Sequence, residues 1–211
     1  MSDKFIKGWE KRGESFSEQA KEMINPDRTP LKSRIESAIR GLQIETQKLD
    51  QVSHTLGQRD KDLFEKIVAA QTRHDIPHSN IYATELAELR KTEKTVQQSK
   101  LALEQIVLRV QTVREWGDIV ASMAPAVGVI RNVKKAVGRV MPEVEKELGD
   151  VGESISSLLI EAGEYTGGSL NLNTSNEEAE KILSEAAVVA EQKMKDKFPE
   201  MPSGTPSGER A

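Results

Sequence analysis

Apolar residues recur every three or four positions along two long stretches of the chain. The first stretch begins at Leu31 and the second at Tyr82. An α-helix turns once every 3.6 residues, so this spacing gathers the apolar side chains into one stripe on each helix. Stripes of this kind are buried by pairing, so the pattern predicts two long helices that pack together. The stripes contain Leu31, Ile35, Ala38, Ile39, Leu42, Leu49, Val52 and Leu56, then Tyr82, Leu86, Leu89, Val96, Leu103, Val107 and Val110.

A short sequence between the stripes indicates where the chain turns back. Leu56-Gly57-Gln58-Arg59-Asp60 places a glycine, which ends helices well, before an aspartate, which begins them well. This predicts an antiparallel hairpin over about residues 30–116, whose first helix ends near residue 57 and whose second begins near Asp60. Pro77 then falls inside the second helix and predicts a kink or short break there.

Shorter helices are expected after the hairpin. An apolar stretch over about 118–140 contains Pro125, and Met141-Pro142-Glu143 begins a further helix that ends near Gly163. A capping box at Ser175-Asn176-Glu177-Glu178 opens a short helix over 176–197. The predicted fold class is therefore all-α, a long antiparallel helical hairpin followed by shorter helices and a flexible acidic tail.

This pattern divides the chain into three parts. Residues 1–28 form an amphipathic N-terminal segment, and residues 29–165 form a helical core that holds the hairpin and the helices over about 118–163. Residues 166–211 contain a polar linker, the short helix and a disordered tail rich in proline, glycine and serine.

The N-terminal segment separates apolar from basic residues. At about 100° per residue, an apolar stripe faces away from a row of lysines, an arrangement typical of helices that lie on anionic membranes. The alternative is that its aromatic residues pack on the hairpin. The candidate membrane-binding residues are Lys4, Phe5, Ile6, Lys7, Trp9, Lys11 and Phe16.

Composition narrows the possible functions. The chain has 211 residues, of which 36% are hydrophobic and 4% aromatic, so thin layers of helices fit better than a thick core. Without cysteine it has no disulfide, no thiol nucleophile and no cysteine-ligated zinc. The longest uncharged run, residues 119–130, is too short to span a bilayer, and no signal peptide is visible.

Charge is unevenly distributed. Residues 1–142 hold 24 Lys and Arg against 19 Asp and Glu, a net +5, whereas residues 143–211 hold 6 against 15, a net −9. Either the basic part meets an anionic partner or the acidic tail folds back onto it. The basic residues are spread out and have no interleaved aromatics, so an anionic membrane is favoured over nucleic acid as the partner.

No catalytic or metal site can be assembled from the sequence. His74 and His78 have the spacing of two ligands on one helical face, but Pro77 lies between them and a surface pair is the better interpretation. Gly167-Gly168 has no lysine and no preceding strand, both of which a phosphate loop requires. We therefore expect neither an enzyme nor a cofactor.

Several blocks of the chain, taken in order, resemble the ESCRT-III family, and most closely its archaeal cell-division members of the CdvB type. The resemblance covers about residues 30–202. It is carried by Pro30 to Ile35, Arg59 to Lys66, Ile81 to Lys91, Leu101 to Gln105, Glu178 to Leu183 and the tail to Phe198-Pro199.

The resemblance implies a subunit that polymerises on the cytoplasmic face of the cell membrane, remodels or cuts it in archaeal cell division, and is turned over by an AAA ATPase. Its implied partners are copies of itself, paralogous subunits, an anionic membrane and the MIT domain of that CdvC-type ATPase. The family's proline-type MIT-binding motif matches Phe198, Pro199, Met201 and Pro202, although Thr205 stands where a further proline is expected.

Two further expectations come with this assignment. The chain ends at Ala211, so a paralogue without the C-terminal winged-helix-like module is expected. A soluble coiled-coil adaptor or membrane-stress scaffold is the alternative, because it would share the hairpin but would not need a tail that binds an ATPase.

Overall fold

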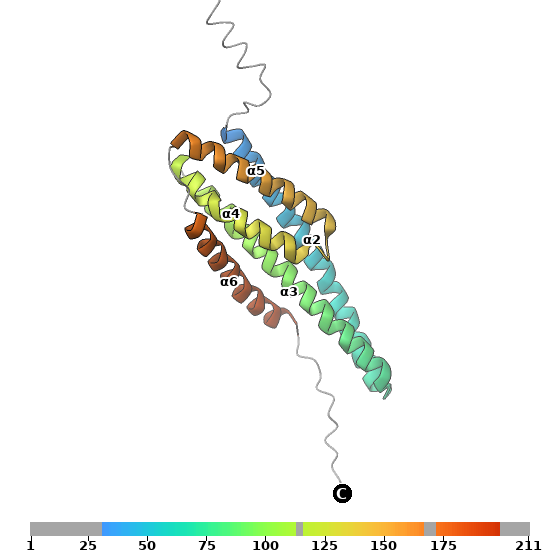
Figure 1. Cartoon of the computed structure of the whole chain (residues 1–211). Coiled ribbons are helices and arrows are strands. Elements are labelled where there is room, and N and C mark those ends of the chain that lie inside the picture. The colour runs from blue at the N-terminus through green and yellow to red at the C-terminus, as the bar shows by residue number, and fades with distance from the viewer. Residues whose placement is uncertain (1–30, 113–115, 167–171, 199–211) are drawn as a thin grey trace, which may run out of the picture. The chain divides into compact units, whose positions relative to one another are not determined.

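A computed structural model describes residues 31–112, 116–166 and 172–198 of the chain (Figure 1). In these residues the chain forms α-helices and no strand, which confirms the all-α prediction. The chain divides after Ser37 into two units, and the first contributes only the beginning of α2 to the described residues. The second unit, Ala38–Ala211, holds the rest of the described residues. The helices are α2 (Leu31–Thr72), α3 (Ile76–Thr112), α4 (Trp116–Val137), α5 (Pro142–Thr166) and α6 (Leu172–Lys197).

The hairpin turns about fifteen residues later than its sequence suggested. Helix α2 continues through Gly57 to Thr72, so the predicted turn at residues 57–60 is wrong. A glycine inside a helix costs about 1 kcal/mol relative to alanine. That cost is outweighed because the buried seam continues unbroken at every seventh position through Leu49, Leu56, Leu63 and Ala70.

The turn itself lies at Arg73–Asp75. The Asp75 N–H donates to the Ala70 carbonyl and the His74 N–H to the Gln71 carbonyl, both at 2.9 Å, the pair of bonds that defines a Schellman motif. His74 therefore has a left-handed φ of 57°. Pro77 lies in the first turn of α3, where a missing N–H is harmless. The kink or short break predicted beside Pro77 is found as a break at residues 73–75, where it forms the hairpin turn itself.

The two hairpin helices pack in antiparallel register. Leu63, Ile67 and Leu86 form a buried cluster near the turn. Polar pairs extend the register away from the turn, because Asp60 meets Arg90, Ser53 meets Gln97 and Asp50 meets Lys100. Each step along α2 is thus matched by an equal step along α3.

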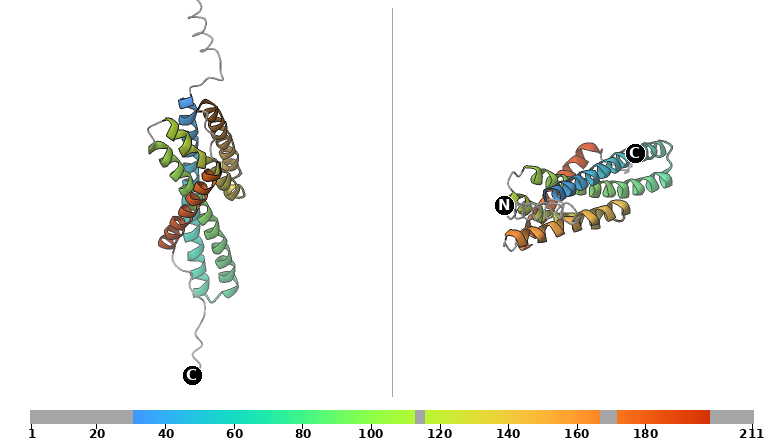
Figure 2. Two further views of the ribbon diagram at one scale, coloured as in Figure 1. Left: turned by 60° about the vertical axis from the view of Figure 1, so that its left-hand side comes forward. Right: turned by 90° about the horizontal axis from the view of Figure 1, so that it is seen from above.

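The three shorter helices pack beside the hairpin. Helix α4 contacts α3, α5 and α6, and α6 contacts both α3 and α4, as the views in Figures 1 and 2 show. Pro125 lies inside α4, as expected for the interrupted apolar stretch. Helix α6 begins at Leu172, four residues before its predicted start. None of the described helices is long and apolar enough to cross a membrane.

Candidate functional site: acidic residues in the hairpin seam

Three acidic side chains occupy buried positions in the hairpin seam. Glu45 and Asp60 of α2 are 3% and 1% exposed, and Glu93 of α3 has no exposed surface. Burying a carboxylate is costly unless a cation or a hydrogen-bond donor accompanies it. The contacts of each acid therefore show which helices the seam holds.

Asp60 is satisfied within the hairpin. The Arg90 guanidinium donates to both carboxylate oxygens, with Nε 2.6 Å from Oδ2 and Nη2 3.1 Å from Oδ1. Two parallel bonds of this kind fix the orientation of both side chains. This pair joins α2 to α3 and sets the position of Arg90 for a second contact described below.

Glu93 receives its partner from α6. Nζ of Lys197, the last residue of α6, lies 2.6 Å from Glu93 Oε1. The other carboxylate oxygen, Oε2, is buried without a hydrogen-bond partner among the described residues. Burial raises the pKa of Glu93, and the Lys197 ammonium opposes that shift. The seam thus holds a half-satisfied acid whose cation comes from another helix.

Phe198 completes this docking point. Its side chain is only 9% exposed, and its ring lies 5.2 Å from Arg90 Cζ and 5.1 Å from Lys197 Nζ. Both distances fall within the range of cation–π attraction. Gly57 leaves room for this arrangement, since a Cβ built there would lie 2.7 Å from Lys197 Nζ. The glycine that suggested a turn instead admits the end of α6.

The rest of α6 is held by small residues and surface ion pairs. Ala179, Ala186 and Ala190 are buried, and a Cβ built on Gly128 of α4 would lie 2.9 Å from that of Ala179. Val189 was expected on the buried side but is 41% exposed.

The expected return of the acidic tail region onto the hairpin is seen in the contact between α6 and α3. Two further ion pairs join these helices, Lys94–Glu191 at 3.3 Å and Arg109–Glu178 at 3.2 Å.

Glu45 receives its partners from α2 and α5. Lys48 Nζ lies 3.2 Å from Glu45 Oε1 and also donates to Glu147 Oε2 of α5. Burial, followed by the hydrogen bond to Glu147, raises the pKa of Glu45 to about 7. The two half-satisfied acids of the seam, Glu45 and Glu93, are therefore where α5 and α6 meet the hairpin.

The structure describes only part of the predicted binding residues. Phe198 is placed as above, whereas Pro199, Met201 and Pro202 lie outside the described residues. The seven predicted membrane-binding residues, from Lys4 to Phe16, lie outside them as well. Sequence reasoning missed Glu45, Asp60 and Glu93. Their signal was available, because each falls on the stripe of its own helix at a position where an apolar residue is expected.

The histidine pair belongs to the hairpin turn. The His78 ring lies 2.8 Å from Asp75 Oδ2, and that hydrogen bond lowers the pKa of Asp75. Over the described ranges, no group of three or more His, Asp or Glu side chains is arranged to hold a metal ion.

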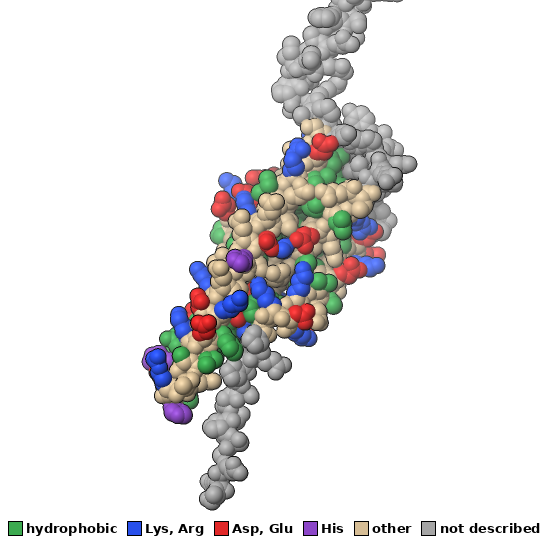
Figure 3. All heavy atoms as spheres, turned by 180° about the vertical axis from the view of Figure 1, so that it is seen from behind, with side chains coloured by type: hydrophobic (Ala, Val, Ile, Leu, Met, Phe, Trp, Pro, Cys, Tyr) green, Lys and Arg blue, Asp and Glu red, His purple; other side chains and the backbone are tan. Residues whose placement is uncertain are grey.

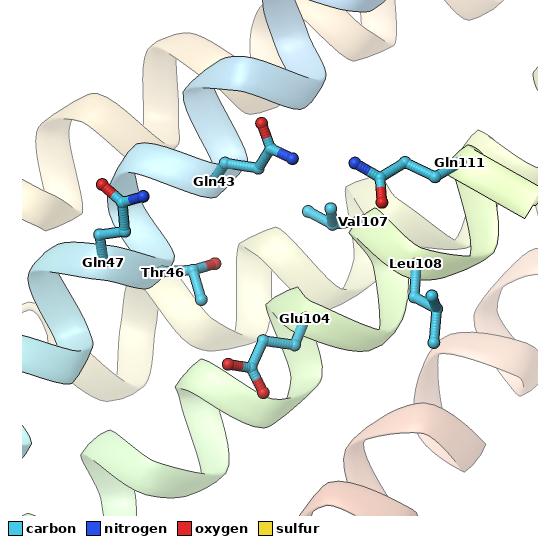
Figure 4. Close-up of a pocket in the computed structure, with 7 residues that line it drawn as sticks. All are labelled: Gln43, Thr46, Gln47, Glu104, Val107, Leu108 and Gln111. Carbon is cyan, nitrogen blue, oxygen red and sulfur yellow. The ribbon is translucent and has the colours of Figure 1, made fainter.

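A groove of about 550 Å³ lies between α2 and α3 (Figure 4). The Thr46 hydroxyl is already bonded to the Leu42 carbonyl at 2.8 Å, and Glu104 supplies the lining's one carboxylate. This lining offers no acid–base pair. Basic and acidic side chains are interspersed on the face shown in Figure 3. The groove is lined by Gln43, Thr46, Gln47, Glu104, Val107, Leu108 and Gln111.

A long antiparallel hairpin with shorter helices docked on its buried acids defines the protein as an all-α helical-hairpin protein. The chain is 41% identical over 203 residues to Cell division protein B1 of Sulfolobus acidocaldarius, a match that covers 96% of this chain and 92% of that protein. It is 33% identical over 155 residues to Cell division protein B of the same organism, covering 74% of this chain and 59% of that protein. The chain belongs to this CdvB family of archaeal cell division proteins. No family model matches it, and no solved structure matches it.

Proposed function

We propose that the protein is an ESCRT-III-like subunit that polymerises on the cytoplasmic face of the cell membrane during division, where it remodels or cuts the membrane without catalysing a reaction. The observation that carries the proposal is the match to Cell division protein B1 over 96% of the chain. Relatives named as division proteins support assembly with copies of itself and with paralogous subunits. The separated basic and apolar residues of the N-terminal segment support attachment to an anionic membrane.

The way α6 is attached supports a protein that changes conformation. Among the described side chains, the buried residues of α6 are three alanines and Ile182, and its surface ion pairs contribute about 0–1 kcal/mol each. The Lys197 and Phe198 contacts lie at the end of the helix, so their loss frees it from that end. Release would expose hairpin surface for a neighbouring subunit, and in this proposal docked α6 restrains assembly.

The same release would couple assembly to turnover by the ATPase. Phe198 begins the candidate MIT-binding motif that continues through Pro199, Met201 and Pro202. The Phe198 ring cannot occupy both the Arg90 contact and a groove on a MIT domain. In this proposal the ATPase therefore binds the tail only after α6 has left the hairpin.

Electron microscopy and sedimentation, with and without anionic liposomes, test the assembly proposal. We expect the full chain to form filaments on liposomes, and a 1–170 truncation to do so at lower protein concentration. Trp9→Glu combined with Phe5→Glu should sharply reduce co-sedimentation. A chain that neither binds liposomes nor forms filaments would favour the soluble adaptor alternative instead.

Binding of the tail is tested separately by titration calorimetry with a MIT domain. A peptide over residues 190–211 should bind, and Met201→Asp should abolish binding, because Met201 loses an apolar contact worth about 1.5–3 kcal/mol if fully enclosed. Equal binding by both peptides would show that the motif is assigned wrongly.

A further inference from the structure

Lys48 of α2 lies between two carboxyl groups from different helices. Its Nζ is 3.2 Å from Glu45 on the same helix and donates to Glu147 of α5. The Glu45 side chain is 3% exposed, and its Oε2 is buried without a hydrogen-bond partner among the described residues. Two acids therefore share one cation at the contact between α2 and α5.

A second contact shows how closely the helices approach there. A Cβ built on Gly41 would lie 2.8 Å from Cγ2 of Val151. Gly41 lies one turn before Glu45 on α2, and Val151 lies one turn after Glu147 on α5. The contact between Gly41 and Val151 thus lies one helical turn from the acidic pair. A wider spacing between α2 and α5 would break both contacts.

Charge balance at this contact depends on a proton. Two carboxylates and one ammonium leave a net negative charge beside a buried acid, which is unfavourable. A proton on Glu45 removes that charge and lets Glu45 donate a hydrogen bond to Glu147. Burial and that hydrogen bond raise the pKa of Glu45 to about 7, whereas the hydrogen bond and Lys48 lower the pKa of Glu147. Lys146 of α5 also acts on Glu147 and lowers its pKa further.

We propose that Glu45, Lys48 and Glu147 form a proton-dependent clasp that holds α5 against α2, closed when the two carboxyl groups share a proton and weakened when that proton is lost. The clasp rests on contacts inside the fold and does not depend on whether the chain polymerises. It also differs from the α6 docking point, which uses Glu93 on the other hairpin helix.

The direction of the pH dependence follows from the docked and released states. Glu45 has a pKa of about 7 when α5 is docked, and release of α5 removes the Glu147 hydrogen bond and part of the burial, which moves this pKa down toward its ordinary value of 4.5. Docking therefore takes up a proton between these values, so α5 is held more tightly as pH falls through 7 and less tightly above it. Docking lowers the pKa of Glu147, and by itself this would make docking tighter as pH rises. That effect is confined to pH values near and below the ordinary Glu147 pKa of 4.5. From pH 5.5 to pH 8 the ratio of docked to released α5 should fall, by about 25-fold at most.

Hydrogen exchange on the full chain measures this ratio even when release is rare. The readout is the protection of α5 amides around Glu147, corrected for intrinsic exchange rates and referred to amides near Leu86 in the hairpin core. We expect wild-type protection to fall from pH 5.5 to pH 8, by about 25-fold at most. Glu45→Gln keeps a hydrogen-bond donor but cannot titrate, so its protection should stay constant. An equal fall in wild type and Glu45→Gln, or no fall in wild type, would overturn the proposal.

Two further variants guard against a folding defect in Glu45→Gln. Glu147→Gln changes a side chain that is 39% exposed and removes the second carboxylate, so it should reduce the pH dependence, while burial of Glu45 keeps part of it. Gly41→Leu places a side chain against Val151 and should lower α5 protection at both pH values. A Glu147→Gln variant with wild-type pH dependence would refute the shared proton. Protection that survives Gly41→Leu would refute the contact itself.

Discussion

The Lys197 ammonium lies 2.6 Å from a carboxylate oxygen of Glu93, which has no exposed surface. The two residues are 104 positions apart in the chain. The ion pair matters most for what its loss leaves behind, an acid in the hairpin seam with no cation. The end of α6 is thereby attached to the middle of α3.

Lys197→Met should loosen α6. Breaking a fully buried pair costs about 3–5 kcal/mol, and because Lys197 is 41% exposed we expect about 1–2 kcal/mol here. Hydrogen exchange of α6 amides measures the loss. Lys195→Met is the matched control, because Lys195 pairs with Glu191 on the exposed side of its own helix. Equal protection in the two variants would mean that Glu93 does not hold α6.

Phe198→Ala should also loosen the end of α6. The substitution removes a buried ring and its contacts with Arg90 and Lys197, which we expect to cost about 2 kcal/mol at the end of a helix. Limited proteolysis within 190–198 should become faster. Val188→Ala removes an apolar side chain that is 69% exposed and should leave the cleavage rate unchanged. Cleavage that is equally slow in Phe198→Ala and wild type would contradict the docked position of the ring.

His74→Gly should stabilise the protein. His74 has a φ of 57°, a conformation that costs an ordinary residue about 1 kcal/mol and glycine little. Glycine makes the unfolded chain more flexible, and this offsets part of the gain. The net increase in the free energy of unfolding should therefore be about 0.5 kcal/mol. Urea denaturation measures it. Arg73→Gly, one residue earlier, should not stabilise, and a destabilised His74→Gly variant would contradict the position of the turn.

Leu86→Ala should strongly destabilise the hairpin. Leu86 is fully buried against Leu63 and Ile67, and a substitution of this type costs about 2–5 kcal/mol. Leu108→Ala on the same helix provides the control, because Leu108 is 62% exposed and should change the free energy of unfolding by less than about 0.5 kcal/mol. Thermal or urea unfolding of both variants distinguishes the buried from the exposed position. Similar losses in both would show that the register of α3 is wrong.

The sequence by itself determined the helices and their pairing. Apolar spacing around Leu42, Leu49 and Leu86 depends only on the 3.6-residue turn, which is a local property of the backbone. It therefore predicted an all-α chain, a long hairpin and the approximate bounds of α4 and α5. Local signals misled at Gly57, because a good helix terminator ends a helix only where burial on both sides does not outweigh its cost.

The tertiary structure alone decided what the polar exceptions in the stripes do. Glu45 and Glu93 stand out in the sequence as acids at apolar positions, but their partners Glu147 and Lys197 lie about 100 residues away along the chain. Similarly, the room that Gly57 leaves has a purpose only when the end of α6 arrives beside it. Spacing along one helix carries no information about which distant side chain will reach its surface, because that depends on how all the helices pack together.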